Sequence, residues 1–222
     1  MNQIELSNGL IAFGGNKGIG KTRFSLKLAN LIAKTEKVLF VSYQDYREKL
    51  HAILEEIDNE VNENLEINTS FDYFNVGTFL GIINHIEAKE FTTLFIDDLD
   101  CFNRNEFHEF KEIEKDSAIE GLLFLSKHLN IRVIITLVLT KDYPSPNHYK
   151  PQLRDFDWSR KIVNDCSQIF ALYRPEFYGI TKNEEGLSLL GLIEILTLKS
   201  ENHIEQIYKL DNKQLNIYTQ RF

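Results

Sequence analysis

The chain has 222 residues, 43% of them hydrophobic and including 16 Phe and 9 Tyr, so its composition predicts a well-packed globular protein and excludes a disordered one. The net charge of −8 argues against a protein that coats nucleic acid by bulk electrostatic attraction, although a local basic groove is compatible with it. The two cysteines, Cys101 and Cys166, lack metal-ligand spacing and predict no disulfide framework. There is no secretory signal pattern and no apolar run of about 18 residues, so we expect a cytoplasmic protein without a membrane span.

Apolar, β-branched runs alternate with helical patterns along most of the chain, which is typical of a parallel sheet covered by helices on both faces. The expected strands comprise residues 10–13, 37–42, 92–96, 131–139 and 168–173. The expected helices comprise residues 23–34, 45–57, 78–88 and 106–129. Two stretches are expected to be loops: residues 59–76, which are polar and weakly patterned, and residues 141–154, which contain most of the prolines.

The C-terminal tail has a different pattern. Residues 189–199, 204–210 and 214–219 alternate or run apolar like antiparallel edge strands, with a tight turn at residues 211–213. No internal repeat, low-complexity tract or linker interrupts the sequence. We therefore expect residues 1–222 to form one α/β domain, with a doubly wound, mainly parallel sheet and antiparallel strands at its C-terminal end.

The first expected strand leads into a strict G-x-x-x-x-G-K-[ST] phosphate loop, which comprises Gly15-Asn16-Lys17-Gly18-Ile19-Gly20-Lys21-Thr22. Its glycines let several backbone N–H groups point at a phosphate, and the following helix adds positive charge at its N-terminus. Lys21 can reach the β and γ phosphates, and the Thr22 hydroxyl suits a magnesium ion. The alternative is an ordinary glycine-rich turn before a helix, but the strand–loop–helix context favours nucleotide binding.

An acidic residue at the end of a buried strand commonly completes such a site by holding the magnesium ion. Leu94-Phe95-Ile96-Asp97 has this pattern, since apolar residues are followed by a carboxylate at the carboxyl edge of the expected sheet. The alternative is that Asp97 and Asp98 merely begin a turn. Together with the phosphate loop, the pattern favours Asp97 as the magnesium-side carboxylate.

Four stretches resemble the RecA-like motor domain of DnaB-type replicative helicases. They are the phosphate loop, the Asp97-Asp98-Leu99-Asp100 strand end, the helix and strand at residues 121–134, and residues 151–174 from Pro151-Gln152-Leu153-Arg154 to Leu172-Tyr173-Arg174. The resemblance covers nearly the entire chain, and its last stretch is the most specific. It implies a RecA-like P-loop NTPase fold with ATP or ADP and Mg²⁺ as ligands, and single-stranded DNA and a replication or repair protein as candidate partners. No counterpart of the family's N-terminal helical domain is expected in residues 1–222.

The sequence departs from that family where the γ-phosphate would be attacked. Gln44 occupies the position of the family's glutamate that activates water, and an amide cannot accept a proton near neutral pH. Val138 occupies the position of a glutamine that senses the γ-phosphate. Because both groups are replaced, we expect hydrolysis to be slow or absent.

Two further stretches combine matches and departures. Lys199 matches the lysine of a family hairpin that reaches into the neighbouring subunit's site, which implies a catalytic role in trans, but Glu201 replaces the arginine finger. The family's DNA-facing loop corresponds to Arg154, Trp158 and Arg160 here, with Asp155 and Asp157 beside them. The mixed charge predicts weak binding of single-stranded DNA at most. Trp158 is expected to pack the loop onto the domain in preference to stacking on bases.

Three hypotheses remain open from the sequence. The first is an ATP-binding domain derived from helicases, with slow or absent hydrolysis and an accessory role in DNA replication or repair. The second is a working ATPase motor that moves on DNA. The third is a P-loop kinase or a nucleotide-gated interaction module unrelated to DNA. It is least favoured, because kinases usually have an arginine-rich lid that closes over the phosphates, and the loop at residues 141–160 contains only Arg154 and Arg160.

Overall fold

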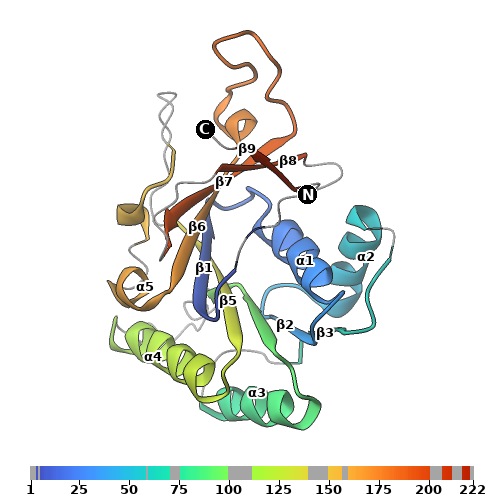
Figure 1. Ribbon diagram of the computed structural model, residues 1–222, viewed down its shortest axis with the longest axis vertical. Coiled ribbons are helices and arrows are strands. Elements are labelled where there is room, and N and C mark those ends of the chain that lie inside the picture. Colours follow the sequence, from blue (N-terminus) through green and yellow to red (C-terminus); the bar gives the residue numbers. More distant parts are fainter. Residues whose placement is uncertain are drawn as a thin grey trace.

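The computed structural model describes residues 4, 6–58, 60–70, 76–99, 112–139, 150–156, 160–200, 207–211 and 217–220. The described strands form one sheet in the order β3-β2-β4-β5-β1-β6-β7-β8-β9 (Figure 1). The strands are β1 (Gly9–Gly15), β2 (Val38–Ser42), β3 (Leu65–Asn68), β4 (Thr93–Asp97), β5 (Arg132–Val138), β6 (Gln168–Tyr173), β7 (Leu192–Lys199), β8 (Ile207–Asp211) and β9 (Ile217–Gln220). The helices are α1 (Lys21–Ile32), α2 (Arg47–Ile57), α3 (Val76–Lys89), α4 (Glu112–His128) and α5 (Arg160–Asp165), with short 3₁₀ turns η2 (Leu153–Asp155) and η3 (Pro175–Tyr178).

The sheet has a parallel part and an antiparallel part. Strands β3, β2, β4, β5, β1 and β6 all run parallel, whereas β6–β7, β7–β8 and β8–β9 pair antiparallel. This arrangement confirms the prediction of a mainly parallel sheet with antiparallel strands at its C-terminal end. The long β6–β9 ribbon therefore extends the sheet beyond the strands that hold the phosphate loop.

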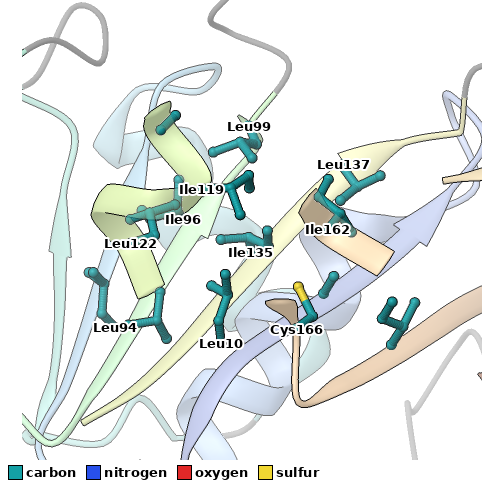
Figure 2. Packing of buried hydrophobic residues seen from close by; sticks show 14 of the residues in the cluster. Leu10, Leu94, Ile96, Leu99, Ile119, Leu122, Ile135, Leu137, Ile162 and Cys166 are labelled. Carbon is teal, nitrogen blue, oxygen red and sulfur yellow. The ribbon is translucent and has the colours of Figure 1, made fainter. Parts of the chain in front are cut away.

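Two hydrophobic clusters fill the space between the sheet and its helices. Ile119 and Leu122 of α4 pack with Leu94 and Ile135 on one face, as Figure 2 shows. On the other face, α1 and α2 contribute their own buried residues, such as Phe24 of α1. Strands β1, β2, β4, β5 and β6 alternate their side chains between these two clusters and are buried on both faces, which explains the near-continuous apolar runs in the sequence.

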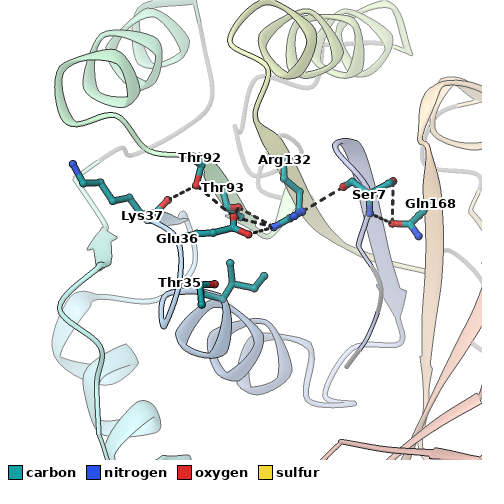
Figure 3. Close-up of polar contacts among 9 residues, drawn as sticks. Ser7, Thr35, Glu36, Lys37, Thr92, Thr93, Arg132 and Gln168 are labelled. Carbon is teal, nitrogen blue, oxygen red and sulfur yellow. Dashed lines mark hydrogen bonds and ion pairs between the residues drawn. The ribbon is translucent and has the colours of Figure 1, made fainter. Parts of the chain in front are cut away.

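Polar contacts join the amino ends of the parallel strands (Figure 3). The Arg132 guanidinium at the start of β5 donates to Glu36 Oε2 over 3.1 Å, to Thr93 Oγ1 over 3.2 Å and to the Ser7 carbonyl oxygen over 3.3 Å. Ser7 N–H in turn donates to Gln168 Oε1 over 2.8 Å at the start of β6. These contacts fix one end of the sheet, while the phosphate loop lies at the carboxyl end.

The prediction of a loop over residues 59–76 is wrong for residues 65–68. They form β3, which pairs in parallel with β2 at the edge of the sheet. Leu65 and Ile67 are buried while Glu66 and Asn68 are half-buried, but four residues give too short an alternation to stand out from the polar sequence around them. Helix α5 was likewise not predicted, because its six residues span less than two turns.

Among the described residues, no helix combines the length and the apolar character needed to cross a lipid bilayer.

Candidate functional site

The phosphate loop joins β1 to α1 at the carboxyl end of the sheet. Strand β1 ends at Gly15 and helix α1 begins at Lys21, so the five residues between them turn the chain from strand to helix. Gly18 and Gly20 have φ angles of 79° and 105°, which residues with a Cβ atom rarely adopt. The motif fixes glycine at Gly20, where the backbone requires it, whereas Gly18 meets the same requirement at a position that the motif leaves open.

Lys21 is the first residue of α1 and is only 8% exposed. Its ammonium donates to the carbonyl oxygens of Gly15 and Asn16 over 3.2 and 3.4 Å, so the side chain folds back over the loop. The ammonium therefore lies at the loop whose N–H groups would surround a phosphate. This is the geometry expected of the motif lysine.

Asp97 lies beside the start of α1, although it is 75 residues away in sequence. The Thr22 hydroxyl donates to Asp97 Oδ2 over 2.8 Å, and the Thr136 hydroxyl of β5 donates to Oδ1 over 2.6 Å. Burial raises the pKa of Asp97 to about 6, and the charge of Asp98 acts in the same direction. The hydrogen bonds from Thr136 and Thr22 and the charge of Lys21 oppose this rise in the pKa. A bound cation would favour the ionised form of such a carboxyl.

The oxygen atoms of Thr22 and Asp97 fit a magnesium ion. Magnesium prefers oxygen ligands and commonly takes one or two from protein and the rest from phosphates and water. Among the described residues, no group of three or more His, Cys, Asp or Glu side chains could hold a metal ion by itself.

A cleft of about 340 Å³ opens over the loop and α1. One wall carries Lys17, Gly18, Gly20, Lys21, Thr22 and Arg23, and the facing residues are Gln44, Asp98 and Val138. The structure thus brings Gln44 and Val138 to the cleft, where the family pattern would place the groups that act on a γ-phosphate. The Gln44 amide donates to Asp98 Oδ2.

Sequence reasoning missed two residues of this region. Thr136 is the only polar residue in the run Val133-Ile134-Ile135-Thr136-Leu137-Val138, and a lone hydroxyl in a buried strand is a signal that could have found it. Tyr178 follows β6 in η3, and its hydroxyl accepts a hydrogen bond of 2.9 Å from the Asn16 amide. Nothing in the local pattern around Tyr178 points to the phosphate loop.

Lys199, Arg154 and Arg160 lie outside the cleft lining. Lys199 donates to the carbonyl oxygens of Val163 and Asn164 over 2.8 and 3.0 Å, at the end of α5. Arg154 and Arg160 are exposed, in η2 and at the first residue of α5.

Of the acidic residues predicted beside the DNA-facing loop, Asp155 is fully buried. Its Oδ2 accepts the Gln152 N–H over 2.8 Å, which caps η2. Asp155 was counted in the mixed charge that the sequence predicts for the loop, but its side chain is buried. Trp158, Asp157 and Glu201 lie outside the described residues.

Comparison with known proteins agrees with this architecture. The chain superposes on a solved ATPase domain with a TM-score of 0.76 and 16% identity, covering 96% of this chain and 85% of that one. A DnaB-like replicative helicase, described with its interactions with primase, gives a TM-score of 0.75 at 16% identity over 96% of this chain, which spans 59% of that helicase chain. This chain therefore has the fold of a DnaB-like helicase ATPase domain. No protein-family model matches the sequence, and no curated protein matches it.

Proposed function

We propose that this chain is an ATP-binding RecA-like domain with slow or absent ATP hydrolysis. The observation that carries the proposal is the contact between Thr22 of the phosphate loop and Asp97 at the end of β4, beside the Lys21 ammonium. A chance match to the loop motif would not bring an acidic strand end to the motif hydroxyl. The contact joins two parts of the sequence, the phosphate loop and the end of β4, that one magnesium–nucleotide ligand would use.

Each residue has a role that follows from its chemistry. The N–H groups of the loop and the Lys21 ammonium bind the β and γ phosphates, and Thr22 and Asp97 hold the magnesium ion. When bound, Mg²⁺ neutralises phosphate charge. The Lys21 ammonium, which donates to the carbonyl oxygens of Gly15 and Asn16, has three N–H donors and would form charge-assisted hydrogen bonds to a bound phosphate.

Slow hydrolysis is supported by the side of the cleft that faces the loop. Gln44 cannot take a proton, and Val138 offers no hydrogen bond to a γ-phosphate. Lys199, the candidate for action in trans, is engaged with the end of α5 in this chain. We therefore propose an accessory role in DNA replication or repair, in which nucleotide binding matters more than turnover.

DNA and a partner protein belong to the same proposal. The exposed Arg154 and Arg160 lie near each other in sequence and are candidates for weak phosphate contacts with single-stranded DNA. The two structural relatives are described as an ATPase domain and as a helicase with interactions with primase, which supports a replication or repair protein as the partner class. Residues 1–222 would act as one nucleotide-binding unit.

The test combines binding with turnover. Titration with a fluorescent ATP analogue in Mg²⁺ should show saturable binding that ADP displaces, and steady-state phosphate release should stay below about 1 s⁻¹, the lower end of common enzyme rates. Single-stranded DNA should change that rate little. Absence of binding would contradict the proposal, and turnover of several per second stimulated by DNA would favour a working motor.

A further inference from the structure

Asp98 is a carboxylate in the cleft to which sequence reasoning gave no role in chemistry. It is 4% exposed, follows Asp97 at the carboxyl end of β4, and lines the same cleft as Lys21 and Gln44. Strands β2 and β4 are parallel neighbours in which Ser42 is paired with Asp97. The residues that follow the two strands, Gln44 and Asp98, therefore lie side by side.

The pair has complementary chemistry. Gln44 donates its amide N–H to Asp98 Oδ2, and this contact restrains the carboxylate at the cleft wall. A glutamate at position 44 would place a second negative charge against Asp98, which electrostatic repulsion disfavours. An amide at position 44 and a carboxylate at position 98 are thus consistent with each other.

We infer that Asp98, held by Gln44, is the carboxylate that orients the attacking water in whatever hydrolysis this chain performs. The inference rests on the proposed function, because it requires ATP in the cleft. Lys21 marks where the terminal phosphates bind, and Asp98 borders the same 340 Å³ space. The carboxylate absent from the end of β2 is present at the end of β4.

The step is an ordinary hydrolysis. Asp98 accepts a hydrogen bond from a water molecule and thereby directs a lone pair of the water oxygen at the γ-phosphorus. The new bond joins the water oxygen to the γ-phosphorus, and the bond to the bridging oxygen breaks. That oxygen leaves with its electron pair on ADP, and a proton of the water is released to solvent with inorganic phosphate.

The test is single-turnover hydrolysis, with protein in excess over radiolabelled ATP in Mg²⁺, and affinity for a fluorescent ADP analogue is measured in parallel. Asp98→Ala should slow phosphate release about 100-fold, since the water loses its orientation. Asp98→Asn should slow it about tenfold, since a neutral acceptor is weaker. Affinity for the ADP analogue should change by less than about threefold for both variants.

Asp58→Asn is the matched control, because Asp58 Oδ2 also accepts an amide hydrogen bond, from Asn30 over 2.9 Å, but lies outside the cleft lining. Its rate should match wild type. Unchanged rates in the Asp98 variants would overturn the inference, as would rate and affinity falling together, which would make Asp98 a binding group. A wild type that binds ATP without turnover also overturns it and leaves the proposed function intact, whereas a wild type that binds no nucleotide contradicts the proposed function itself.

Discussion

The two walls of the cleft differ in how closely their residues match the pattern of DnaB-type helicases. The binding wall, formed by the phosphate loop and the start of α1 together with Asp97 at the end of β4, carries the groups that we propose bind phosphate and magnesium, from Lys21 to the Thr22–Asp97 contact. The facing wall, at the ends of β2, β4 and β5, carries Gln44, Asp98 and Val138. Its carboxylate thus follows β4, whereas the family's glutamate follows β2. In the proposed function, binding and turnover depend on different walls, so one can be retained while the other changes.

The largest effect is expected on the binding wall. Lys21→Ala removes the charged donor that meets the β and γ phosphates, so affinity for Mg-ATP should fall about 100-fold. Lys34→Ala, which removes an exposed lysine just beyond the other end of α1, is the matched control and should bind like wild type. Fluorescence titration measures both. If Lys21→Ala binds normally, the binding wall has been assigned to the wrong side chains.

Asp97 is expected to reduce the stability of the chain in the absence of ligands. Its pKa in the folded protein is raised to about 6 from 3.8, so the folded state binds the proton more tightly than the unfolded state does. The free energy of unfolding should therefore fall as pH rises from about 4 to 6, by on the order of 3 kcal/mol from this group. Above about pH 6 the free energy of unfolding is lowered by the full amount.

Asp97→Asn separates this stability effect from function. The variant has no charge to bury, so its free energy of unfolding should exceed that of wild type at pH 7 and approach it at pH 4. Urea unfolding followed by circular dichroism measures the difference between the two proteins, in which other titrating groups cancel. The same variant should need more Mg²⁺ to bind ATP. Equal stability of the two proteins at pH 7 would contradict the burial argument.

The attack wall is the side of the cleft that carries Gln44, Asp98 and Val138, and it can be tested by exchanging the groups at positions 44 and 98. Gln44→Glu alone should slow hydrolysis about tenfold, because two carboxylates meet and Asp98 loses its orientation. Adding Asp98→Asn restores a carboxylate–amide pair with the groups exchanged, and the rate should recover. Single-turnover phosphate release shows whether Gln44 holds Asp98 in place or merely replaces a glutamate that hydrolysis needs. A rate that rises in Gln44→Glu would show that the lost glutamate alone limits turnover.

The smallest effect is expected at the DNA-facing candidates. Because Asp155 is buried and caps η2, the loop presents less negative charge than its sequence indicates. Single-stranded DNA should bind weakly and in a salt-sensitive manner, and removing both Arg154 and Arg160 should weaken it about tenfold or less. Fluorescence anisotropy at two salt concentrations measures this. Submicromolar affinity at physiological salt would instead favour a working translocase.

The sequence predicted the positions of the phosphate loop and of Asp97 at the sheet edge because their signals are local. The loop motif occupies consecutive residues, and Asp97 ends an apolar run, so spacing alone brought both to the carboxyl edge of a parallel sheet. The parallel strands were also identified, since burial on both faces gives long apolar runs. Strand β3 was missed because four residues at a sheet edge give almost no pattern.

The attack wall could be predicted only in part, because its contacts depend on register. Gln44 and Asp98 are 54 residues apart, and their contact depends on β2 and β4 ending together. Thr136 reaches Asp97 from a neighbouring element of the sheet in the same way. Neither pairing leaves a spacing signal in one sequence, whereas the positions of Gln44 and Val138 came from a family resemblance.

The central claim is that this chain binds ATP through magnesium and the phosphate loop, and calorimetric titration tests it most directly. Purified wild-type protein titrated with ATP should release or absorb heat in a saturable manner in Mg²⁺, with the signal greatly weakened by EDTA and by Lys21→Ala. The Lys34→Ala control should reproduce the wild-type curve. A wild-type protein that gives no binding heat with millimolar Mg-ATP at two temperatures would contradict the account.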